Sequence, residues 1–141
     1  MHFSRTKLSA IALLCMASPV FAASTVKVVE GGEAGGSMTI TLDKSVIKAG
    51  ETVFLVHNDA VAEEHEMVLV KLKSADQKIK VIAAKHGVDE KQLESLGEVS
   101  DLKPGSDGKL KATLAPGSYV LLCNIKGHYE AGMRAMLTVT E

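Results

Sequence analysis

The sequence has 141 residues, of which 46% are hydrophobic, and its formal net charge at pH 7 is −1. This length suits one domain with a single hydrophobic core, and the nearly balanced charge is not that of a nucleic-acid-binding protein. The sequence contains two cysteines, Cys15 and Cys123.

Residues 1–22 predict a secretory signal peptide. Arg5 and Lys7 precede an apolar run over residues 8–17, and a small-residue pattern that suits cleavage after Ala22 follows. The apolar run is shorter than the roughly 20 residues that a membrane-spanning helix needs. We therefore expect an exported, periplasmic domain of residues 23–141 that has no membrane anchor.

Removal of the signal peptide would leave Cys123 as the only cysteine of the domain. A single thiol cannot form an internal disulfide, and a free thiol in an oxidising compartment requires an explanation. Cys123 could be a buried core residue, because a free cysteine packs as a small hydrophobic side chain, or it could have a chemical role.

Seven segments of the domain are rich in Val, Thr, Ile and Leu and are separated by turns that contain Gly or Pro. These predicted strands are residues 24–30, 38–42, 52–58, 65–72, 109–115, 118–124 and 134–140. About seven or eight short strands in a domain of this size predict an all-β fold, a β-sandwich.

One stretch between the predicted strands has a different pattern. Ser74 and Gln77 form a capping box that precedes isoleucines at helical spacing, and a second helix start is indicated at Asp89. We therefore expect a helical insertion around residues 75–96 rather than a second domain.

The segment after the sixth predicted strand carries the strongest chemical signal. Cys123 lies at the end of that strand, and His128 and Met133 follow it at five-residue intervals. Gly127 and Gly132 interrupt the strand pattern, so we expect a loop that folds back and brings the three side chains together. A thiolate, an imidazole and a thioether form a soft ligand set that suits copper far better than magnesium or calcium.

A fourth ligand must come from elsewhere in the chain. His65 begins a predicted strand, and a residue at the mouth of a strand lies at an end of the sandwich, where the Cys123 loop must also lie. His57, inside a strand, is the reserve candidate, and His86, near the end of a predicted helix, is less able to reach the loop.

Two histidines and one cysteine in a trigonal plane, with a distant methionine, form a blue-copper electron-transfer site. Protein side chains would then occupy every ligand position and leave no position for a substrate. We therefore expect an electron carrier rather than an enzyme.

The segment "PGSYVLLCNIKGHYEAGMRAMLTVT", which contains the C-x4-H-x4-M motif, and the upstream N-x6-H-E pattern resemble the cupredoxins, the type 1 (blue) copper proteins. The resemblance extends from about Thr52 to the end of the chain, the predicted insertion excepted. It implies a Greek-key β-sandwich with one copper ion at one end. His65, Cys123 and His128 would be the equatorial ligands and Met133 the axial one. It also implies single-electron transfer between redox proteins of the cytochrome, oxidase or reductase type, and we expect a monomer.

Two features differ from the plastocyanin-like members. The spacing from cysteine to histidine is longer and is similar to that of rusticyanin and its relatives. Glu66 stands where many relatives have an asparagine after the first histidine. We expect Asn124 to substitute for that asparagine by hydrogen bonding to the loop of His65, because such outer bonds orient metal ligands.

The same site would also suit an alternative function, a periplasmic copper-tolerance or copper-delivery protein. The sequence contains no Met-rich or His-rich tail for bulk copper storage, so electron transfer is the preferred prediction.

Overall fold

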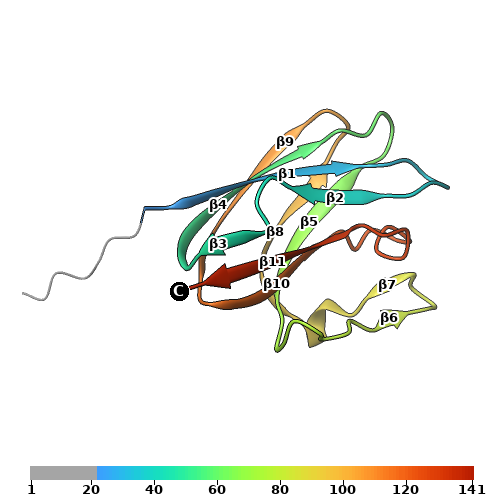
Figure 1. Ribbon diagram of the computed structural model, residues 1–141. Helices are drawn as coiled ribbons and strands as arrows, with labels where there is room; N and C mark the ends of the chain where they lie inside the picture. Colours follow the sequence, from blue (N-terminus) through green and yellow to red (C-terminus); the bar gives the residue numbers. More distant parts are fainter. Residues whose placement is uncertain (1–21) are drawn as a thin grey trace, which may run out of the picture.

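The computed structural model describes residues 22–141 and consists almost entirely of β-strands (Figure 1). The predicted signal peptide lies outside the described residues, apart from Ala22. Within the described part of the chain, no helix has the length and apolar character needed to cross a membrane.

The strands form two main sheets and one small one. In chain order they are β1 (Ser24–Gly31), β2 (Thr39–Leu42), β3 (Val46–Lys48), β4 (Gly50–Asn58), β5 (His65–Lys71), β6 (Val81–Ile82), β7 (Gly87–Val88), β8 (Glu94–Leu102), β9 (Asp107–Leu114), β10 (Gly117–Leu122) and β11 (Arg134–Thr140). The four-stranded sheet has the order β2-β1-β4-β9, the five-stranded sheet has the order β3-β11-β10-β5-β8, and β6 pairs with β7. The chain crosses repeatedly between the two main sheets, so the predicted Greek-key β-sandwich is confirmed, and each of the seven predicted strands is present.

The core lies between the two main sheets and follows the alternation of side chains along each strand. Its wholly or almost wholly buried members include Val26, Phe54, Val56, Leu69, Leu121 and Leu137. Cys123 and Met133 belong to the same apolar cluster, so the loop between β10 and β11 is continuous with the core.

The predicted helical insertion around residues 75–96 is wrong. This stretch contains the small β6–β7 sheet and a single 3-10 turn, η1 (Glu90–Gln92). The side chain of Gln77 accepts a hydrogen bond from the N–H of Lys73 at 2.5 Å, which closes a turn instead of capping a helix. The β-branched residues that follow favour an extended backbone where they can pack on a sheet. Asp89 does cap a helical turn, but that turn is only three residues long.

The edge strand β8 was not evident in the sequence. Most of its residues are polar or exposed, and its pairing with β5 shifts register twice. Irregular pairing of this kind leaves no regular alternation of apolar residues to detect.

Residues 73–93, which we call the outer segment, lie over the outer face of the five-stranded sheet (Figure 1). Ile79, Val81 and Leu93 of this segment pack against a second apolar cluster. Its buried members are Val68, Val70, Leu72, Val88, Val120, Leu122 and Tyr129. Both faces of β5 and β10 are therefore covered, which explains the nearly continuous apolar runs in these strands.

One acidic side chain lies in the core. Glu30 follows Val26 and Val28 on the inward face of β1 and is fully buried. Its two carboxylate oxygens have no hydrogen-bond partner among the described residues. Burial, and secondly the negative charge of Glu66, raises the pKa of Glu30 to about 8. The Glu30 carboxyl group is therefore mostly protonated at neutral pH.

We expect the Glu30→Gln variant to be more stable than the wild-type protein above pH 8. Between the ordinary pKa of 4.5 and the raised value of about 8, the unfolded chain ionises Glu30 while the folded protein does not. The free energy of unfolding therefore falls as the pH rises, by at most about 1.4 kcal/mol per pH unit from this group. Glutamine cannot ionise, so the free energy of unfolding of the variant does not fall with pH for this reason.

Urea unfolding of the copper-free proteins between pH 5 and pH 9 measures the effect. The matched control is Glu51→Gln, which changes an exposed glutamate on β4 and should leave the pH dependence unaltered. A Glu30→Gln protein with the wild-type pH dependence would contradict the prediction.

Candidate metal centre

The loop between β10 and β11 is built from tight turns. Gly127 and Gly132 have φ angles of 86° and 104°, in the left-handed region that favours glycine. The N–H of Cys123 donates to the carbonyl of Met133 at 3.2 Å, and the N–H of Met133 donates to the carbonyl of His128 at 3.1 Å. The loop therefore folds back on itself, as the spacing of the three residues predicts.

His65, Cys123 and His128 come together where β5 begins and β10 ends. The Nδ1 atoms of His65 and His128 are 3.3 Å apart, and Sγ of Cys123 is 3.4 Å from Nδ1 of His128. One potential ligand atom from each residue lies within 4.8 Å of the others. His65 and Cys123 are fully buried, whereas His128 is 6% exposed.

Met133 is fully buried beside this group. Its backbone hydrogen bond with Cys123 fixes it next to the thiol-bearing residue, and both side chains pack in the same apolar cluster. Its role as a fourth ligand remains a prediction.

The two alternatives to His65 lie elsewhere. His57 is on β4 in the other sheet, where its Nδ1 is 2.7 Å from the carboxylate of Asp107. His86 is in the outer segment, and its Nδ1 is 3.2 Å from the carboxylate of Glu130. Among the histidines of residues 22–141, only His65 and His128 join the thiol.

Burial determines the protonation of the thiol. It raises the pKa of Cys123 to about 12, and nearby backbone groups of Ile125 and Glu66 offset this only in part. The negative charges of Glu30 and Glu66 raise the pKa further. A thiolate at this position therefore requires a nearby positive charge to stabilise it.

Burial acts in the opposite direction on the two imidazoles and lowers the pKa of both His65 and His128. Within residues 22–141, Nε2 of His65 has no hydrogen-bond partner, although the backbone of Gly32 opposes the lowering of the pKa of His65. Two neutral imidazoles whose Nδ1 atoms face each other, together with a thiol, are a donor set that copper binds well. The residues present therefore fit a copper ion.

Glu66 and Asn124 connect the two segments that carry these side chains. Oε1 of Glu66 accepts a hydrogen bond from the N–H of Asn124 at 3.0 Å, which links the residue after His65 to the residue after Cys123. The side chain of Asn124 does not reach the loop of His65 and bonds to the outer segment instead. The sequence does not predict that the Asn124 side chain bonds to the outer segment, because its pattern favours a helical insertion around residues 75–96.

Asn58 is a supporting residue whose role the sequence analysis did not identify. Its buried side chain donates to the carbonyls of Glu63 at 2.9 Å and Leu102 at 2.8 Å, and it accepts from the N–H of Ala60 at 2.9 Å. These bonds fix the loop that leads into His65. The N-x6-H-E pattern contained this signal, because Asn58 is its first residue.

The comparisons with known proteins agree with the inference that these side chains can bind copper. Residues 26–140 match a family described as copper binding proteins, plastocyanin/azurin family. Among solved structures, the chain is similar to reduced auracyanin from Roseiflexus castenholzii (22% identity, 86% of this chain and 100% of that chain covered, TM-score 0.58). It is also similar to rusticyanin from Thiobacillus ferrooxidans (17% identity, 85% of this chain and 80% of that chain covered, TM-score 0.59). A third similar structure is the azurin Az-iso2 from Methylomonas sp. strain J (18% identity, 84% of this chain and 98% of that chain covered, TM-score 0.56). At these identities the structural likeness shows a shared fold. No match was found among curated protein sequences.

We expect copper binding near pH 7 to release about one proton. The lowered pKa values leave both imidazoles neutral, so the proton comes from the Cys123 thiol, whose pKa is about 12. The apparent affinity should then fall about tenfold for each unit by which the pH is lowered, until the imidazoles also protonate.

Isothermal calorimetry in buffers that differ in protonation enthalpy gives the number of protons released. Release of two or three protons would show that the imidazoles are charged before binding. Release of none would show that the thiol does not ionise.

Proposed function

Because the chain belongs to the plastocyanin/azurin family of copper-binding proteins, we propose that it is an exported carrier of single electrons. The protein binds one copper ion; in this proposal His65, Cys123 and His128 hold the ion in a plane and Met133 is a weaker axial ligand. The observation that carries the proposal is the convergence of one buried thiol and two buried imidazole nitrogens within 4.8 Å.

The burial and anchoring of these side chains suit a carrier better than an enzyme. Bound copper supplies the chemistry of the site by alternating between Cu(II) and Cu(I). His65 and Cys123 are fully buried. Cys123 belongs to the apolar core and its N–H bonds to Met133, while His65 pairs with Leu102 of β8, so both can move little when the charge changes. The same packing keeps water and substrates away from the ligand atoms.

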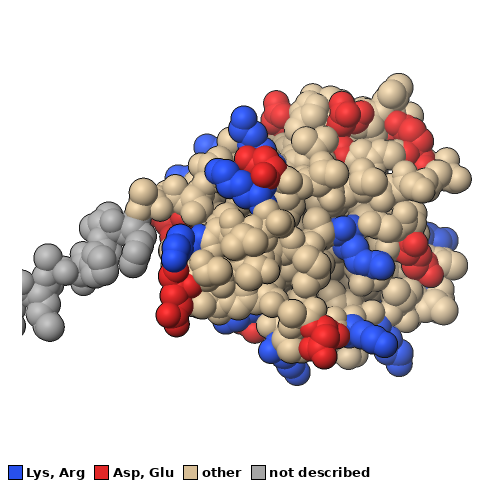
Figure 2. Space-filling model, viewed as in Figure 1, with Lys and Arg blue, Asp and Glu red and all other residues tan. Residues whose placement is uncertain are grey.

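His128 is the route by which an electron would enter and leave. Among the three converging residues it alone has exposed surface, and its Nε2 lies 3.9 Å from the carboxylate of Glu63. Partly exposed Ile125 gives apolar surface close to it along the loop. Small contacts of this kind suit the brief encounters of redox proteins, such as a cytochrome, an oxidase or a reductase. Figure 2 shows acidic and basic side chains interspersed over one face of the molecule, which gives no support to nucleic-acid binding.

We expect one equivalent of Cu(II) to give the copper-free protein an intense visible thiolate-to-copper absorption band. The Cys123→Ser variant should lose the band, because a hydroxyl cannot supply the thiolate. The matched control is His57→Ala, which removes a histidine of the other sheet and should bind copper with the wild-type spectrum.

A colourless wild-type protein would contradict the proposed site. A coloured protein that exchanges electrons only slowly in voltammetry would instead fit the copper-tolerance or copper-delivery function.

We expect the Met133→Leu variant to keep the visible band and to have a higher reduction potential than the wild-type protein. The thioether stabilises the oxidised ion weakly, and leucine fills a similar volume without donating electron density. Protein-film voltammetry measures the shift. Loss of copper binding in this variant, or an unchanged potential, would contradict an axial role for Met133.

A further inference from the structure

The outer segment contacts the loop between β10 and β11 (residues 123–133), which we call the metal-binding loop, beside Cys123. The side chain of Asn124, the next residue, accepts a hydrogen bond from the N–H of Val88 at 2.7 Å and donates to the carbonyl of Val88 at 3.1 Å. It also donates to Oε1 of Glu90 at 2.6 Å. The carboxamide therefore pairs with both backbone groups of Val88, as a neighbouring strand would.

A second contact lies beside His128. The N–H of Gly127, the preceding residue, donates to the carbonyl of His86 at 2.7 Å. His86 has a φ of 51°, a backbone conformation that few non-glycine residues adopt. The ring of His86 lies 3.2 Å from the carboxylate of Glu130, two residues after His128. His86 therefore contacts the loop both before and after His128.

Packing accompanies these hydrogen bonds. Tyr129 follows His128, is 7% exposed and belongs to the same apolar cluster as Val88. The Tyr129 ring, which is part of the loop, also lies 5.0 Å from the guanidinium of Arg134, the first residue of β11. The loop is therefore held between the core on one side and the outer segment on the other.

Gly87 shows how closely the two segments approach. A Cβ atom at this position would lie 2.7 Å from Oδ1 of Asn124, which is closer than real Cβ contacts. The Asn124 carboxamide occupies the space that any larger residue would need. Gly87 is thus required by the contact with the loop.

We infer that the outer segment is a positioning element of the metal centre, which orients Cys123 and His128 through Asn124 and Gly127. The inference rests on the proposed copper site and goes beyond it, because the residues involved lie outside the ligand set. Covering the outer face of the sheet requires only apolar contacts. The hydrogen bonds to the residues next to Cys123 and His128 add nothing to that cover, but they limit the movement of both side chains.

The test compares Asn124→Ala with the wild-type protein. Loss of the outer contacts of a metal site typically lowers metal affinity about 10- to 100-fold, and we expect a decrease in that range in competition with a copper chelator. The electron paramagnetic resonance spectrum of the Cu(II) form should also change. In the copper-free protein, the Gly127 amide should exchange its hydrogen faster.

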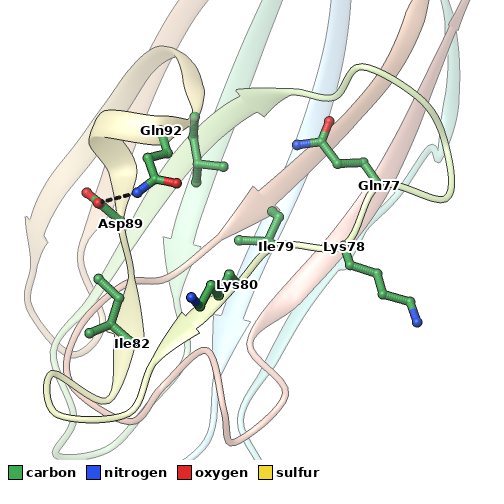
Figure 3. Close-up of a pocket in the computed structure, with 8 residues that line it drawn as sticks. Gln77, Lys78, Ile79, Lys80, Ile82, Asp89 and Gln92 are labelled. Atoms are coloured by element: carbon green, nitrogen blue, oxygen red, sulfur yellow. Dashed lines mark hydrogen bonds between the residues drawn. The ribbon is translucent and has the colours of Figure 1, made fainter.

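Gly87→Ala is the second variant and should act in the same direction, because its methyl group displaces the Asn124 carboxamide while every loop residue is retained. The matched control is Gln92→Ala in the same segment. Figure 3 shows Gln92 bonded to Asp89, at 2.9 Å, in a pocket lined also by Ile79 and Ile82. This bond does not involve the loop, so the control should keep the wild-type affinity, spectrum and amide exchange.

Wild-type copper affinity, spectrum and Gly127 exchange in both Asn124→Ala and Gly87→Ala would overturn the inference. An equal loss in Gln92→Ala would also overturn it, because the effect would then reflect general weakening of the segment. Failure of the proposed function would look different, since the wild-type protein itself would give no thiolate-to-copper band. Hydrogen exchange of the copper-free proteins would still test the positioning of the loop in that case.

Discussion

The metal centre depends on the antiparallel pairing of β5 with β10. Leu122 pairs with Val68, and continuing this register brings Cys123 and Asn124 opposite the start of β5, where His65 lies. The hydrogen bond from the N–H of Asn124 to the Glu66 carboxylate follows the same register. Because side chains alternate along a strand, a slip of one residue between β5 and β10 would turn the thiol away from the imidazole of His65.

The position of the site inside the sandwich determines its electrostatics. Burial opposes the ionisation of Cys123, and the carboxyl groups of Glu30 and Glu66 oppose it further. The same burial keeps His65 and His128 neutral and able to bind a cation. A cation at this place would therefore stabilise the Cys123 thiolate, which the protein interior otherwise disfavours, and this suits tight retention of one ion.

The metal-binding loop is supported from two directions. The apolar core holds Cys123 and Met133 from the inside, and the outer segment contacts Asn124, Gly127 and Tyr129 from the outside. In the proposed role of electron carrier, such support would keep the site nearly unchanged between its two charge states, which lowers the barrier to electron transfer. The outer segment, which lies between β5 and β8, thus adds a second layer of contacts around the metal-binding loop.

The sequence by itself determined the seven main strands and the loop that carries Cys123, His128 and Met133, whereas the tertiary structure decided that His65 and not His57 joins Cys123 and His128. Those strands are marked by period-2 alternation and by Gly and Pro turns, and Cys123, His128 and Met133 lie on one short loop, so local spacing limits where they can be. Only the tertiary structure decided the path of the outer segment, the partner of the Asn124 side chain and the burial of Glu30. Each of these depends on contacts between residues far apart in the chain. The Ser74 to Gln77 pattern, for example, is equally compatible with a helix cap and with the turn that packing on the sheet selects.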